Sequence, residues 1–123
     1  KHLNNFTMNQ LTEQEPTLVI LQKLAEKIKE DIKIWETQKP EDTPENKNKF
    51  KKAKNILIHH FKQMLFGQII YYWSLEVFKS KQNIHQLQDD ILSFVRNIDS
   101  QTGFKIEDRD VEYLKDKMDF LWS

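Results

Sequence analysis

The feature that most constrains the fold is a stretch of about 35 residues, Pro44 to about Ser80, with helical apolar spacing and no proline after its first turn. Thr43, Pro44 and Glu45 favour a helix start, because they supply a hydroxyl cap, a first-turn proline and an acid near the positive end of the helix dipole. A helix of this length spans about 50 Å.

Apolar residues occupy more than one side of this predicted helix. One stripe consists of Phe50, Ala53, Leu57, Met64, Tyr71, Leu75 and Phe78, and a second consists of Ile56, Phe66, Ile70, Trp73 and Val77. The second half is therefore apolar nearly all round, which is typical of a helix at the centre of a bundle or in an interface. Gly67 lies at the transition and marks either a bend or a close helix crossing.

Three further helices are predicted around this one. The first begins between Thr12 and Pro16 and ends by Lys39, because the following proline disfavours helical geometry in that residue. The others cover about 84–98 and about 107–121, with a break over 99–103. The sequence thus predicts an all-α bundle of four helices, or five if Gly67 divides the long one. Residues 1–10 are expected to form a flexible arm, and residues 11–123 a single all-helical domain.

Composition excludes several classes of protein. The chain has 19 basic and 19 acidic residues, so overall charge does not favour DNA, RNA or an anionic membrane. It has no cysteine, which excludes disulfides, a thiol nucleophile and cysteine-bound zinc. No apolar stretch is long enough to span a membrane. No signal-peptide pattern remains at the start. The location is unknown: an intracellular one is favoured, and a secreted effector stays open.

No set of residues indicates catalysis or a cofactor. The loop Asp99–Asp110 lies between two helices as a calcium-binding EF-hand loop does, but Gly103 is one position early and the last residue is Asp instead of Glu. His59 and His60 are adjacent, so their side chains point about 100° apart on a helix. The acid pairs Asp89–Asp90 and 107–108 are typical of a solvated helix face. We therefore expect no enzyme, no metal site and no cofactor.

Lysines concentrate in the first half of the long helix, where no acid occurs between Asn46 and Leu75. Such a stripe could contact phosphates. The alternative is a solvated helix face, and the presence of only two arginines favours it. The possible polyanion-binding residues are Lys47, Lys51, Lys52, Lys54 and Lys62.

Large apolar side chains concentrate in the second half of the same helix. Most are expected in the core, but three consecutive aromatics on a helix point in three directions, so at least one should reach the surface. Tyr and Trp are favoured anchors of protein interfaces. The interface candidates are Phe66, Ile70, Tyr71, Tyr72, Trp73, Val77 and Trp122.

The leading hypothesis is a non-enzymatic helical interaction domain, either a subunit of a larger assembly or an effector or adaptor domain. Its partner would be a protein, in a homo- or hetero-oligomer, docked on an aromatic-rich helix face. A nucleic-acid-associated helical module using the lysine stripe is the alternative. A small-molecule carrier also stays open, because the sequence does not distinguish a pocket from a filled core.

Overall fold

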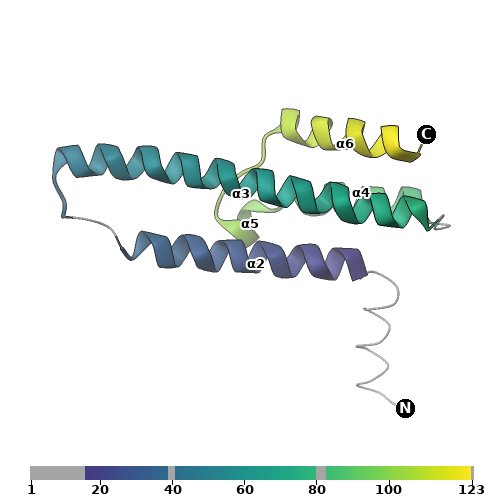
Figure 1. The fold of residues 1–123 in the computed structure, drawn as a ribbon, viewed down its shortest axis with the longest axis horizontal. Helices are drawn as coiled ribbons and strands as arrows, with labels where there is room; N and C mark the ends of the chain where they lie inside the picture. The colour runs from purple at the N-terminus through teal and green to yellow at the C-terminus, as the bar shows by residue number, and fades with distance from the viewer. Residues whose placement is uncertain (1–15, 39–40, 80–82, 123) are drawn as a thin grey trace, which may run out of the picture.

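The computed structural model describes residues 16–38, 41–79 and 83–122, and within these ranges it consists of five helices and no strand (Figure 1). This confirms the predicted all-α bundle around a long central helix. The predicted arm, residues 1–10, and the capping residues before Pro16 lie outside the described residues.

Helix α2 covers Pro16–Glu36 and runs antiparallel to the central helix (Figure 1). Its buried side repeats every three or four residues, as expected for an amphipathic helix. Leu21, Ala25 and Ile28 are completely buried there. Near its C-terminal end, the Trp35 ring stacks on Phe50 with 4.6 Å between ring centroids. Contacts in the middle and at the C-terminal end therefore fix the alignment of α2 along its neighbour.

Helix α3, Pro44–Phe78, spans the length of the molecule without a break at Gly67 (Figure 1). The Thr43 hydroxyl caps it by accepting a hydrogen bond from the Asn46 backbone N–H at 3.1 Å, which satisfies an otherwise unpaired donor. Its core side consists of Phe61, Leu65, Phe66, Ile69, Trp73 and Glu76. The helix extends beyond α4 and α6 at its N-terminal end, where α2 is the one described helix beside it (Figure 1).

The predicted break over 99–103 contains one more helical turn. Helix α4 covers Ile84–Arg96, and the short helix α5 covers Asp99–Thr102. Gly103 then ends α5 with φ of 86°, a left-handed conformation that favours glycine. The buried Thr102 hydroxyl donates to the Ile98 carbonyl at 2.9 Å and accepts from the Phe104 N–H at 3.3 Å. These bonds turn the chain toward the last helix.

Helix α6, Asp108–Trp122, begins one residue later than predicted and carries two acids in its first turn, as the helix dipole favours. It packs on α3 and α4. The Trp73 indole of α3 is completely buried, and its N–H donates to the Met118 carbonyl of α6 at 3.0 Å. One core formed by α2, α3, α4 and α6 therefore lies on one side of α3.

Candidate functional site: the exposed face of the central helix

The side of α3 opposite its core is exposed along most of the helix. It consists of Ala53, Ile56, His60, Met64, Gly67, Tyr71, Leu75 and Phe78, hereafter the exposed α3 face. Successive members are three or four residues apart, so they form one straight stripe on an α-helix. Phe78 is 89% exposed, Ile56 71% and Tyr71 56%. These side chains are available to a partner in the single chain.

This face lacks charge, although charged residues make up 31% of the chain. The sequence has no acidic or basic residue from Gln63 to Leu75. The next residue, Glu76, lies on the other side of the helix, where it is buried and accepts a hydrogen bond from the Thr17 hydroxyl at 2.8 Å. A solvent-facing helix surface usually carries charged or polar side chains. An uncharged, largely apolar one is typical of an interaction site.

The predicted interface residues do not share one surface. Trp73 and Phe66 belong to the core, with 0% and 7% of their surface exposed. Ile70, Val77 and Trp122 are partly buried against that core, and Tyr72 is half-buried. Tyr71 alone among the candidates lies on the exposed α3 face. A side chain buried in the core cannot contact a partner. The candidate site therefore consists of Tyr71 and the other residues of the exposed α3 face.

The remaining members of the exposed α3 face are not among the interface residues predicted from sequence. The first of the two apolar stripes could have identified four of them, because it contains Ala53, Met64, Leu75 and Phe78 beside Tyr71. Ile56 is in the second stripe, and His60 and Gly67 are in neither. Periodicity shows that the residues of one stripe share a side of the helix. It does not show whether that side faces the core or the solvent.

The predicted polyanion-binding lysines are divided between paired and solvated side chains. Lys47 forms an ion pair with Asp42 at 3.4 Å, Lys54 with Glu36, and Lys62 with Asp110 at 3.9 Å. Lys51 and Lys52 are exposed and form no ion pair within the described part of the chain. The stripe is thus neutralised in part by acids of its own domain.

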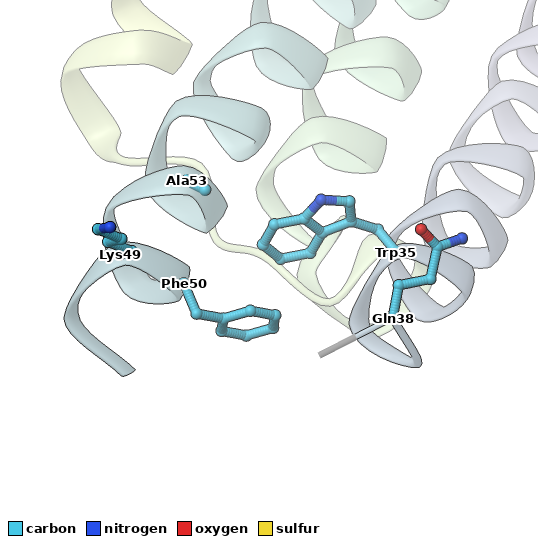
Figure 2. Close-up of a pocket in the computed structure, with 5 residues that line it drawn as sticks. All are labelled: Trp35, Gln38, Lys49, Phe50 and Ala53. Carbon is cyan, nitrogen blue, oxygen red and sulfur yellow. The ribbon is translucent and has the colours of Figure 1, made fainter. Parts of the chain in front are cut away.

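A surface cavity of about 260 Å³ lies at the end of α2 and the start of α3 (Figure 2). Trp35 and Phe50 project toward each other across it, and Gln38, Lys49 and Ala53 complete the lining. The cavity is below the size of typical ligand pockets, about 300–1,000 Å³. The two rings stack on each other. We therefore attribute these residues to the packing of the α2–α3 pair.

A polar contact joins α4 to α6. The Asp119 carboxylate accepts hydrogen bonds from Lys115 at 2.8 Å and from the largely buried Gln88 at 2.7 Å. The bond from Lys115, followed by that from Gln88, lowers the pKa of Asp119 below its usual value. The same bond raises the pKa of Lys115. The contact fixes one helix against another and is not part of the exposed α3 face.

Among the described residues, no three histidine, aspartate or glutamate side chains gather as a metal site would require. None of the described helices contains a stretch sufficiently long and apolar to cross a membrane. Comparison with known proteins gave no matching family, no similar curated protein and no similar solved structure. The function is therefore inferred from the surface alone.

Proposed function

We propose that this chain is a non-enzymatic helical interaction domain that docks a protein partner on the exposed α3 face. One observation carries the proposal. A helix face from Ala53 to Phe78, about 38 Å long at 1.5 Å per residue, is solvent-exposed, uncharged and mostly apolar. Isolated exposed apolar residues are common and need no explanation, but a continuous stripe of them is characteristic of protein recognition.

The shape of the exposed α3 face indicates which kind of partner surface it can bind. A straight stripe along a single helix matches the apolar side of another helix, because both repeat every three to four residues. Tyr71 and Phe78 lie seven residues apart and can anchor such a contact, since aromatic side chains contribute large apolar areas at interfaces. The partner surface is therefore expected to be an amphipathic helix.

A nucleic-acid-associated module remains the alternative function, and the ion pairs of Lys47, Lys54 and Lys62 count against it. A phosphate would have to compete with carboxylates already in place. The expected result is weak retention on an immobilised polyanion at low salt. Strong retention that is lost in salt and reduced by K51E/K52E would instead support the alternative.

Site-specific photo-crosslinking tests the proposed docking face. A photoreactive amino acid replaces Tyr71 in one variant and Tyr113 of α6 in the other, because these tyrosines are 56% and 55% exposed. We expect defined protein adducts from position 71 and none from position 113, in an extract of the source cells. Equal labelling from both positions, or none from position 71, would mean that the exposed α3 face is not a docking site.

A further inference from the structure

We infer that the partner docked on the exposed α3 face is a second copy of this chain, with the two α3 helices antiparallel. The two-fold axis would pass midway between Met64 and Gly67. This inference rests on the proposed function and names its partner. Three properties of the face support a second copy: its symmetric spacing with matched side-chain sizes, its unexplained glycine, and its lack of charge.

The spacing along the face reads the same in both directions. From Ala53 to Phe78 the steps are three, four, four, three, four, four and three residues. When two such helices meet antiparallel, positions whose numbers add to 131 lie opposite each other. The facing pairs are then Ala53 with Phe78, Ile56 with Leu75, His60 with Tyr71, and Met64 with Gly67. An isologous interface requires this self-matching arrangement.

Side-chain size is complementary in the same register. At the centre, Met64 faces Gly67, and at each end Phe78 faces Ala53. A large side chain thus meets the smallest ones at both places, as packing of one helix into another requires. Between them, Ile56 faces Leu75, which are of similar volume. Sizes are matched at three of the four facing pairs, and the fourth brings the rings of His60 and Tyr71 together.

Gly67 has no packing role in the single chain. A Cβ added at this position would meet no atom of another element within 4 Å among the described residues, so no described neighbour requires a glycine there. The residue has helical geometry and no positive φ. Glycine destabilises a helix interior relative to alanine. Close approach of another helix on this face would explain the glycine, because the missing side chain leaves room for Met64 of the second copy.

Charge also permits contact between identical faces. Two copies of a charged surface repel when they meet, whereas the stretch from Gln63 to Leu75 has no charged residue to oppose itself. The exposed lysines Lys51 and Lys52 precede the face. Salt is therefore expected to have little effect on the association.

The extent of the face places the contact in a size class of interfaces. A stripe about 38 Å long and one helix diameter, about 10 Å, wide covers roughly 400 Å² per copy. Stable complexes bury about 800 Å² per partner, so the contact falls in the class of weak, reversible interfaces. We expect a dissociation constant on the order of 10–100 µM.

Cysteine cross-linking tests both the second copy and its orientation, because the chain has no cysteine of its own. The variants are I56C and L75C, both at exposed positions. A short bismaleimide can bridge two facing cysteines, because packed helix axes lie only about 8–10 Å apart and the facing side chains project toward each other. We expect a covalent dimer when the two variants are mixed and little when either is alone. Identical positions would lie about 28 Å apart in the antiparallel pair.

One of the two variants is labelled with ¹⁵N, so that the mass of the covalent dimer shows whether it contains one I56C chain and one L75C chain. Cross-linking of either variant by itself would indicate parallel helices and overturn the stated register. Circular dichroism of both variants must match that of the parent chain, and any variant that does not is replaced by the facing pair H60C and Y71C.

Sedimentation equilibrium measures the association without substitution or reagent. We expect a dimer of the parent chain that survives high salt, at least tenfold weaker association in Tyr71→Glu, and no change in Tyr113→Glu. A parent chain that stays monomeric at about 1 mM, tenfold above the upper limit of the expected dissociation constant, would overturn the second copy as partner. Adducts of another protein at position 71 would then still support the proposed function, and their absence would remove both.

Discussion

Gly67→Ala is expected to stabilise the single folded chain, since no other element of the described structure lies within 4 Å of the added Cβ. Alanine is favoured over glycine in a helix interior by about 1 kcal/mol. Without a clash to offset it, that difference should appear almost entirely in the free energy of unfolding. For a domain of this size it corresponds to an increase of about 4 °C in the melting temperature.

The measurement is urea unfolding followed by circular dichroism at a few micromolar protein, where the expected dimer is dissociated. Gly103→Ala is the matched control, because it has the same chemical change and an equally open site. Its φ of 86° should make that variant less stable by about 1–2 kcal/mol. If Gly67→Ala were neutral or destabilising, α3 would not present an open helical surface at this position, and the exposed α3 face would be wrongly defined.

Three further substitutions test the contacts that orient α3 and α6. Trp73→Phe should destabilise the fold by about 2–4 kcal/mol in urea unfolding, because it removes the buried hydrogen bond to the Met118 carbonyl and opens a cavity. Thr17→Val should cost about 1–3 kcal/mol by the same measurement, because it removes a hydrogen bond to the buried Glu76 carboxylate. Asp119→Asn should make the free energy of unfolding less dependent on pH in the acid range. The pKa of Asp119 is lowered in the folded chain, so the ionised carboxylate stabilises the fold above the ordinary carboxyl pKa. That stabilisation is lost as the pH falls through the lowered pKa. An unchanged acid limb in pH-dependent unfolding would contradict that assignment.

Helix positions can be predicted because start and stop signals are local. Thr43 and Pro44 mark the beginning of α3 in the sequence and occupy the capping and first positions in the structure. The extra turn at 99–102 is not predicted, because it depends on where the left-handed residue falls. Gly103 ends that turn, and its left-handed conformation becomes evident only from its φ of 86° in the structure.

The buried side of α3 cannot be predicted, for a physical reason. Where a helix is apolar nearly all round, its own sequence does not fix which side turns inward. That rotation depends on partners far along the chain, such as the Met118 carbonyl that receives the Trp73 N–H and the Thr17 hydroxyl that binds Glu76. These contacts place Trp73 in the core and leave Tyr71 outside. Periodicity identifies the stripe that contains Tyr71, but the exposure of that stripe follows only from tertiary packing.

The distribution of charge determines whether the domain binds a partner through electrostatic or apolar contacts. Ion pairs within the domain occupy Lys47, Lys54 and Lys62, and the chain as a whole is formally neutral. Long-range electrostatic attraction therefore contributes little to any encounter, whereas apolar contact along α3 does not depend on net charge. Association through the exposed α3 face should consequently be slow to form, insensitive to salt and selective for shape. A lysine-mediated interaction with a polyanion instead weakens as salt concentration rises. Ionic strength therefore separates the two candidate functions even before the partner is identified.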